Sequence, residues 1–264
     1  MKPIGALKAL GASFLDLLVP RRCAGCGSAC REAPNHYWCE SCRERLPWVR
    51  SPLCPLCGRP YFDSPTSSNH VCGDCLLEPP PFDGARSAAL YSDVVRKRIH
   101  EVKFGGRLYW IPPLVELLWD CLEQWGVKGL DGLVAVPLHV RRVRQRGFNQ
   151  SALLAELLGK RLRLPVFRDA LVRSRWTEPQ TRLKREDRLK NVAHAFVVGN
   201  RSSVHDRALL LIDDVHTTGS TVAACARALK EEGAERVYVL TVARSVPGWK
   251  PLEPQTRTDT SGHG

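Results

Sequence analysis

Short aliphatic runs alternate with amphipathic stretches along most of the chain. Runs typical of buried strands are predicted at 85–91, 133–137, 170–174, 195–198, 208–213 and 236–243. Apolar residues at helical spacing predict helices at 94–103, 114–125 and 222–232, with another beginning near Ala152. This alternation indicates an α/β fold. We expect a mostly parallel sheet flanked by helices, with its site at the carboxyl ends of the strands.

The first 20 residues carry apolar side chains at helical spacing and predict an amphipathic N-terminal helix over 1–20. Lys8 and Asp16 interrupt the apolar run and no small-residue cleavage site follows, which argues against a signal peptide. Nowhere do about 18 apolar residues follow one another, so we expect no membrane span. Without an export signal, a cytoplasmic protein with reduced thiols is expected.

The cysteines fall into two regularly spaced quartets. Nine of the eleven precede residue 76, and eight of these form C-x2-C-x12-C-x2-C followed by C-x2-C-x14-C-x2-C. The predicted metal ligands are Cys23, Cys26, Cys39, Cys42, Cys54, Cys57, Cys72 and Cys75. Four thiolates from two such knuckles suit tetrahedral Zn²⁺, and an all-cysteine site leaves no open position for catalysis. We therefore predict two structural zinc ions in a double zinc ribbon over 21–78.

Some alternatives at the quartets stay open. An iron–sulfur cluster is the main rival for the metal, and His36 or His70 could replace a cysteine ligand. Cys30 has no obvious partner. Gly27 and Gly58 each follow the second cysteine of a leading knuckle, where glycine lets the backbone adopt a positive φ.

The positive charge is concentrated in one segment. The formal net charge is +12, and residues 136–190 hold 15 basic against 5 acidic side chains, a net of +10. Such a concentration indicates an anionic partner, either phosphates or a nucleic-acid backbone. The alternative is a solvated basic helix face.

The stretch 209–221 reads LLLIDDVHTTGST and predicts a phosphate site. Four aliphatic residues form a strand, Asp213 and Asp214 follow at its carboxyl end, and a polar loop leads into the helix predicted from Val222. Loop N–H groups and hydroxyls at a helix N-terminus bind phosphate dianions. Two adjacent carboxylates can accept hydrogen bonds from vicinal sugar hydroxyls. A sugar phosphate fits this pattern.

This stretch resembles the fingerprint of the type I phosphoribosyltransferases, which bind phosphoribosyl pyrophosphate (PRPP) with Mg²⁺. The resemblance implies that Asp213 and Asp214 hold the ribose hydroxyls. It also implies that five loop residues cradle the 5′-phosphate, namely Thr217, Thr218, Gly219, Ser220 and Thr221.

A second strand near 133–137 runs into an arginine-rich segment, VPLHVRRVRQRGFNQ over 136–150. Type I phosphoribosyltransferases place a pyrophosphate-binding loop after such a strand, which implies this role for His139, Arg144 and Arg146. Arginine forks bind oxyanions in a bidentate manner. This segment resembles the ComF family. The two quartets, Lys103-Phe104 and the segment from Gln180 to Asn191 support the resemblance, which covers roughly residues 10–245.

The polar segment 176–190 has two interpretations. In type I phosphoribosyltransferases a mobile loop near this place closes over the substrate, and Lys184 and Arg185 could then reach the pyrophosphate. An exposed charged helix explains the composition equally well.

The predicted organisation is an N-terminal helix at 1–20, the double zinc ribbon at 21–78, a phosphoribosyltransferase-like domain at 82–246 and a disordered tail at 247–264. One hypothesis is a phosphoribosyltransferase that releases Mg-pyrophosphate from PRPP to an unknown acceptor. The other is a non-catalytic PRPP- or nucleotide-binding protein that contacts single-stranded DNA and the competence machinery, because ComF relatives are linked to DNA uptake. The sequence does not give the oligomeric state.

Overall fold

The computed structural model describes residues 21–30, 36–62, 68–174, 195–246 and 249. The elements are α2 Glu40–Glu44, α3 Gly73–Leu77, β1 Gly84–Leu90, α4 Asp93–Gly105, η1 Leu108–Trp110, α5 Ile111–Trp125, β2 Gly132–Ala135, α6 Val140–Arg146, α7 Gln150–Leu162, β3 Leu171–Arg173, β4 Phe196–Val198, η2 Arg201–Ser203, β5 Ala208–His216, α9 Ser220–Glu231 and β6 Arg236–Arg244. The predicted N-terminal helix lies outside these residues, as does the predicted tail apart from Trp249.

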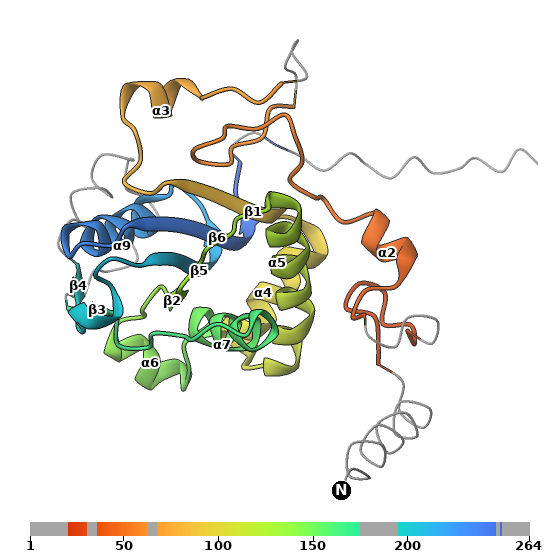
Figure 1. Cartoon of the computed structure of the whole chain (residues 1–264). Helices are drawn as coiled ribbons and strands as arrows, with labels where there is room; N and C mark the ends of the chain where they lie inside the picture. Colours follow the sequence, from red (N-terminus) through yellow and green to blue (C-terminus); the bar gives the residue numbers. More distant parts are fainter. Residues whose placement is uncertain (1–20, 31–35, 63–67, 175–194, 247–248, 250–264) are drawn as a thin grey trace, which may run out of the picture.

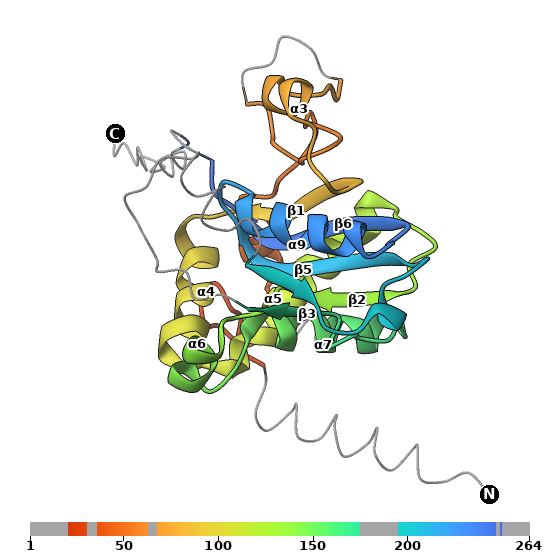
Figure 2. The same ribbon diagram turned by 90° about the vertical axis from the view of Figure 1, so that its left-hand side faces the viewer.

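Four parallel strands form the central sheet in the order β1-β6-β5-β2 (Figure 2). This confirms the α/β fold with a parallel sheet. The predicted strands near 170–174 and 195–198 do not join it. They form β3 and β4, a separate antiparallel pair.

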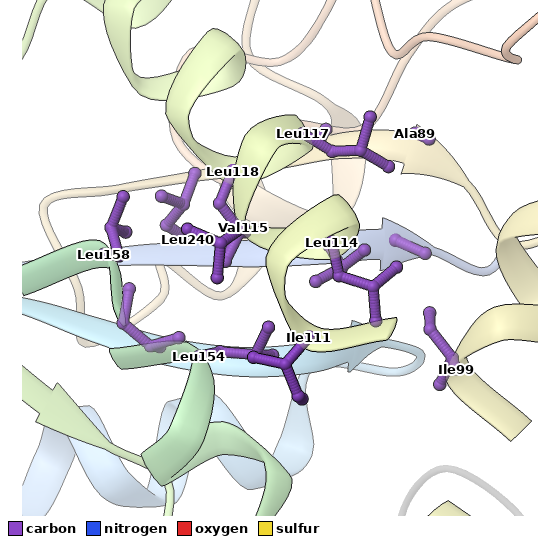
Figure 3. Packing of buried hydrophobic residues seen from close by; sticks show 14 of the residues in the cluster. Ala89, Ile99, Ile111, Leu114, Val115, Leu117, Leu118, Leu154, Leu158 and Leu240 are labelled. Carbon is purple, nitrogen blue, oxygen red and sulfur yellow. The ribbon is translucent and has the colours of Figure 1, made fainter. Parts of the chain in front are cut away.

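The sheet is covered on both faces because successive residues of a strand point to opposite sides. Leu210 and Ile212 of β5 pack with α4, α5 and α7, whereas Leu209 and Leu211 pack with α9 and the β3–β4 pair. Figure 1 shows these two layers, and Figure 3 shows the aliphatic side chains of α5 and α7 against the sheet. This three-layer packing holds the carboxyl ends of the strands in fixed positions.

Three element boundaries differ from the sequence prediction in ways that shape the site. Strand β5 runs through both acids to His216, because its pairing with β6 continues to Arg244. Helix α9 begins at Ser220, two residues before the predicted start. The arginine-rich segment forms the helix α6, where a loop was expected, and ends at Gly147 with φ 83°.

The cysteine-rich segment packs directly on the sheet and its helices (Figure 1). Between the two quartets, the chain pairs with the outer strand β1 through two backbone hydrogen bonds at 3.0 and 2.7 Å, Val49 N to Ala88 O and Leu90 N to Pro47 O. A third bond, Ala85 N to Leu56 O at 2.7 Å, continues this pairing. Residues at both ends of the segment 47–56 therefore bond to the side of β1 that does not face β6.

The first quartet is fixed to α5 by a buried carboxylate. Glu116 is 3% exposed, and it accepts bonds from Tyr37 N at 2.7 Å, His36 Nδ1 at 2.6 Å and Arg43 Nη1 at 3.0 Å. Arg98 of α4 adds a bond from its Nε to Ala24 O at 2.7 Å. A buried negative charge with several donors holds the ribbon in one orientation.

Candidate functional site

Two acids lie side by side near the carboxyl end of β5, as the sequence predicted. Asp213 Oδ1 accepts from Ser151 Oγ and from Asp214 N, both at 2.9 Å. Asp214 Oδ2 accepts from Gln150 Nε2 at 2.9 Å and pairs with Lys103 Nζ at 2.8 Å. Among the described residues, no hydrogen bond reaches the other oxygen of either carboxylate, which leaves one acceptor on each acid.

The partners of the acid pair come from two helix ends. Gln150 and Ser151 are the first residues of α7, which Asn149 caps by accepting from Ser151 N at 3.0 Å. The positive end of the α7 dipole therefore faces the acids. Lys103 comes from the last turn of α4 and neutralises part of their charge.

Asp213 is unusually basic for a carboxyl group. Burial and the neighbouring Asp214 charge raise the pKa of Asp213 from 3.8 to about 7, while Lys103 opposes the shift. Near neutral pH this acid can therefore change its protonation state in response to a ligand.

The predicted phosphate loop forms the turn between β5 and α9. Gly219 caps α9 with φ 81°, and Ser220 Oγ lies 2.8 Å from Thr218 Oγ1. Thr217 and Thr218 are exposed, whereas Ser220 and Thr221 already belong to the first turn of α9. Helix N–H groups and these hydroxyls form a suitable site for a phosphate.

His216 fixes the shape of this turn from below. It is 3% exposed, and a Cβ at position 219 would lie 2.7 Å from its Nε2. Burial lowers the pKa of His216 to about 3, so the ring is neutral. Glycine is therefore required at position 219 for two reasons, the positive φ and the close approach of the His216 imidazole.

Of the three predicted pyrophosphate ligands, Arg146 is linked to the acid pair through Gln150. Arg146 Nη1 donates to Gln150 Oε1 at 2.8 Å, and Gln150 contacts Asp214. His139 caps α6 by accepting from Arg141 N at 3.2 Å. Arg144 lies on the exposed side of α6, and Lys184 and Arg185 lie outside the described residues.

Each cysteine quartet forms a compact cluster. The four sulfur atoms lie within 4.8 Å of one another in both. Cys26 Sγ and Cys39 Sγ are 3.8 Å apart, and Cys57 Sγ and Cys72 Sγ are 3.7 Å apart. A tetrahedron with Zn–S bonds of about 2.3 Å has edges of about 3.8 Å. The donor set and its spacing therefore fit zinc at both sites.

The neighbouring residues support this ligand assignment. Backbone N–H groups of Gly25 and Cys39 donate to Cys23 Sγ, each at 3.3 Å, which favours a thiolate. Gly27 and Gly58 have φ values of 80° and 71°, as predicted. Burial raises the pKa of Cys30 to about 11, and this cysteine is not in the cluster.

The two histidines near the quartets have other roles. His36 Nδ1 contacts Glu116, as described above, while His70 stacks on Tyr61 with ring centroids 4.0 Å apart. Neither belongs to a metal-ligand cluster among the described residues.

A cavity of about 120 Å³ lies between the second quartet and the phosphate loop. Its lining includes Cys57 and Cys75 on one side and Thr218 and Ser220 on the other. Arg244, the last residue of β6, borders it and donates from Nη1 to Cys57 O at 2.7 Å. The second ribbon thus forms one wall beside the phosphate loop.

Sequence reasoning missed several residues of this site. Ser151, Gln150 and Lys103 contact the acids, although the sequence assigned none of them to the site. A polar pair at the first two positions of a helix that faces a predicted acid pair was the available signal. His216 was within the fingerprint, but its role under Gly219 depends on tertiary packing.

Comparison with known proteins agrees with this architecture. Residues 14–76 match the double zinc ribbon domain, and residues 149–259 match the phosphoribosyl transferase domain. "DNA utilization protein YhgH" of Escherichia coli (strain K12) is 36% identical over 218 residues, 81% of this chain and 93% of that protein. "Competence protein ComFC" of Bacillus subtilis is 31% identical over 219 residues, 80% and 86% respectively. "Competence protein F" of Haemophilus influenzae is 28% identical over 225 residues, 80% and 98%.

The fold and the site define a class of protein that joins a double zinc ribbon to a phosphoribosyltransferase-type domain. Its sequence identity to the relatives above, over most of their length, then identifies the family within this class. The chain belongs to the ComF family. In the part that the structure describes, no helix is both long enough and apolar enough to cross a membrane.

Proposed function

We propose that the chain binds PRPP with Mg²⁺ at the acid pair and the adjoining phosphate loop. The observation that carries this proposal is the pair of carboxylates on β5, each with one oxygen that accepts no bond from the described residues, next to the N-terminus of α9. The ribose 2′- and 3′-hydroxyls donate to Asp213 and Asp214. The residues from Thr217 to Thr221 bind the 5′-phosphate.

The cationic groups around the acids support the pyrophosphate end of this ligand. Lys103 pairs with Asp214 directly, and Arg146 is linked to it through Gln150. His139 is the third residue assigned to this end, with Arg144 further out on α6. Mg²⁺ bound together with PRPP would neutralise part of the charge of the pyrophosphate. Lys184 and Arg185 keep the role predicted from sequence, closure over the bound pyrophosphate.

Transfer of the phosphoribosyl group is the reaction that such a site supports. The bond from C1 of the ribose to the pyrophosphate oxygen breaks, a bond from C1 to the acceptor forms, and pyrophosphate leaves. The protein contributes position and charge stabilisation. The two zinc ions are structural, and the protein works in the cytoplasm, where the cysteines stay reduced.

Calorimetric titration of PRPP with Mg²⁺ tests the binding site. The double variant Asp213→Asn/Asp214→Asn should lose binding, whereas Asp206→Asn should retain it. Asp206 is a fair control because it precedes β5 at the opposite end, its side chain is 86% exposed, and Asn tolerates its φ of 57°. Equal PRPP affinity in the double variant and the wild type would overturn the assignment.

Incubation of PRPP with a library of nucleobases and related acceptors then tests catalysis. Release of pyrophosphate with one acceptor supports transfer. If PRPP binds but no acceptor leads to the release of pyrophosphate, the non-catalytic alternative is favoured.

A second candidate function, contact with single-stranded DNA, is favoured by α6. This seven-residue helix carries four arginines, Arg141, Arg142, Arg144 and Arg146, and the last of them is linked to the acid pair through Gln150. The names of the relatives, DNA utilization and competence proteins, agree with it. Binding to a fluorescent single strand should weaken with salt, and Arg144→Ala should lower the salt slope by about one. No detectable binding at low salt would exclude this function.

A further inference from the structure

The second cysteine quartet is held against the sheet by the backbone of its leading knuckle, residues 54–57. A Cβ at position 58 would collide with Ala85 O, so the knuckle lies directly on β1. Three successive carbonyl groups of the knuckle accept bonds from the sheet. These bonds are Arg86 Nη1 to Pro55 O at 3.0 Å, Ala85 N to Leu56 O at 2.7 Å and Arg244 Nη1 to Cys57 O at 2.7 Å. A change in the knuckle therefore reaches the sheet through several bonds at once.

The guanidinium of Arg244 is buried beside a metal-ligating sulfur. Arg244 is 8% exposed, and its Nη2 lies 3.9 Å from Cys57 Sγ. No carboxylate of the described residues pairs with this guanidinium, and Asp74 on the wall of the same cavity pairs with Arg59 at 3.1 Å. A buried cation needs a counter-charge. Four thiolates around one Zn²⁺ carry a net charge of about −2, so the zinc-loaded quartet would supply it.

The same arginine borders the phosphate loop. It is the last residue of β6 and stands opposite His216 in the parallel pairing, and the next residue donates from Ser245 N to His216 O at 2.9 Å. His216 in turn lies under Gly219. Arg244, His216 and Ser220 also line one cavity of about 120 Å³. Arg244 therefore contacts the second quartet on one side and lies next to the phosphate-loop turn on the other.

The first quartet is placed differently. No hydrogen bond among the described residues links it to the phosphate loop. Its contacts run to α4 and α5, through Arg98 and Glu116. These two helices cover the face of the sheet opposite to α9. The first quartet thus provides an internal control for any effect that passes through Arg244.

We infer that Arg244 is a positioning residue that couples the zinc ion of the second quartet to phosphate binding at the loop from Thr217 to Thr221. The inference rests on the proposed function and adds control by metal to it. With zinc bound, the guanidinium stays between Cys57 and His216 and keeps the turn in its binding conformation. Without zinc, the sulfurs are no longer held as a compact anionic cluster, and Arg244 loses its counter-charge. Because coupling between two sites is reciprocal, a bound phosphate raises the affinity of this quartet for zinc.

A competition for zinc in the full-length protein tests the coupling. The zinc-loaded protein is equilibrated with increasing concentrations of a chelator selective for zinc over magnesium, with and without ribose 5-phosphate. A short pulse of a thiol-alkylating reagent follows. Mass spectrometry of the peptides gives, for each quartet, the chelator concentration that exposes half of its cysteines. Ribose 5-phosphate should raise this midpoint about fivefold for the second quartet, within the range of coupling between sites, and leave the first quartet unchanged.

Variants at position 244 test the assigned residue. Arg244→Gln should abolish the shift caused by ribose 5-phosphate and should lower the midpoint of the second quartet even without ligand. Arg244→Lys keeps the charge but not the forked donor, so its shift should be smaller than that of the wild type. A wild-type shift in Arg244→Lys would contradict the role of the guanidinium, and this variant decides the question if Arg244→Gln does not fold.

Arg236→Gln provides the matched control on the same strand. Arg236 is the first residue of β6, at the end away from the phosphate loop, and its exposed side chain pairs with the neighbouring Glu235 at 3.6 Å. This variant should show the full shift of the wild type. Far-UV circular dichroism and the zinc content of the purified protein verify that each variant is folded and loaded.

The outcomes separate the two proposals. If neither PRPP with Mg²⁺ nor ribose 5-phosphate binds in calorimetry, the proposed function fails and this inference fails with it. If only PRPP binds, PRPP with Mg²⁺ takes the place of ribose 5-phosphate in the competition. If the ligand binds but moves the midpoint of neither quartet, the phosphate site stands and the coupling is overturned. An equal shift for both quartets, or a full shift in Arg244→Gln, would also overturn it.

Discussion

At the scale of single residues, Asp213 links ligand binding to pH. The unfolded chain has a carboxyl pKa near 3.8, and the folded protein has one of about 7. Between these values the folded state holds an additional proton, so the contribution of Asp213 to stability falls as the pH rises through this window. Asp213→Asn removes this effect.

Chemical denaturation at several pH values measures this difference. Asp213→Asn should be more stable than the wild type at pH 8, and the gap should narrow as the pH falls towards 4. The wild type should bind PRPP more tightly as the pH rises from 6 to 8, because the ionised carboxylate accepts hydrogen bonds from the ribose hydroxyls. A constant difference in stability across this range would contradict the assigned pKa.

Gly219 provides a second test at this scale. Alanine at a positive φ costs about 1–2 kcal/mol. At position 219 the added Cβ would also lie 2.7 Å from the buried His216 ring. Gly219→Ala should therefore be destabilised more than that backbone cost and should weaken PRPP binding at least tenfold.

The matched control is Gly129→Ala. Gly129 has a similar φ of 72°, and nothing lies within 4 Å of a Cβ built there. It should lose only the backbone contribution and keep normal PRPP affinity. Equal behaviour of the two variants in urea denaturation and calorimetry would show that contact with His216 is unimportant.

At the scale of elements, α5 supports the first ribbon through one carboxylate. Removal of Glu116 leaves Tyr37 N without its acceptor and takes away the contact of His36. Arg43 loses one of its two carboxylate partners and keeps its pair with Asp120 at 2.7 Å. We expect Glu116→Ala to lower the free energy of unfolding by about 2 kcal/mol, the cost of unpaired buried donors.

Glu123→Ala serves as the control on the same helix, since Glu123 is exposed. Its stability should remain within about 0.5 kcal/mol of the wild type. Thermal or urea denaturation measures both. If Glu116→Ala were as stable as Glu123→Ala, the carboxylate would not anchor the ribbon.

The elements show which features the sequence could predict. The aliphatic run from Leu209 to Ile212 and the quartet spacing are local patterns, and they correctly predicted β5 and the metal clusters. The sequence predicts that this strand ends at residue 213, whereas β5 continues to His216, because the continuation depends on pairing with β6. The arginine-rich segment is predicted as a loop, whereas residues 140–146 form the short helix α6. Arginine and glutamine favour helices, so the local propensity agrees with the structure.

The contacts within the site needed the fold. Lys103 and Gln150 are 47 positions apart in the sequence, yet both reach Asp214 Oδ2. No periodicity reports such a pairing, which arises only when α4 and α7 pack beside the same strand. The same reasoning applies to Arg244 and Cys57.

At the scale of the whole molecule, metal binding and sheet integrity are coupled. The quartets have few apolar residues of their own, so metal supplies much of the folding free energy of the ribbons. Chelation should unfold 21–78 and release the segment 47–56 from β1. We expect light scattering by the chelated protein to rise at a rate that increases with protein concentration.

Zinc added before scattering begins should prevent the rise, and magnesium should not. Sedimentation of the chelated protein measures whether it stays monomeric. A chelated protein that remains a stable monomer, with its far-UV circular dichroism reduced only by the ribbon contribution, would show that the sheet does not need the ribbons.

The pairing of 47–56 with β1 has a consequence for how this protein can be divided. Without that segment, β1 would offer a row of unpaired backbone groups along an outer strand, a template for pairing with other chains. We therefore expect the ribbons to limit self-association of the domain that follows them. We expect a chain that begins after the ribbons to self-associate, even though it would retain every residue of the phosphate site.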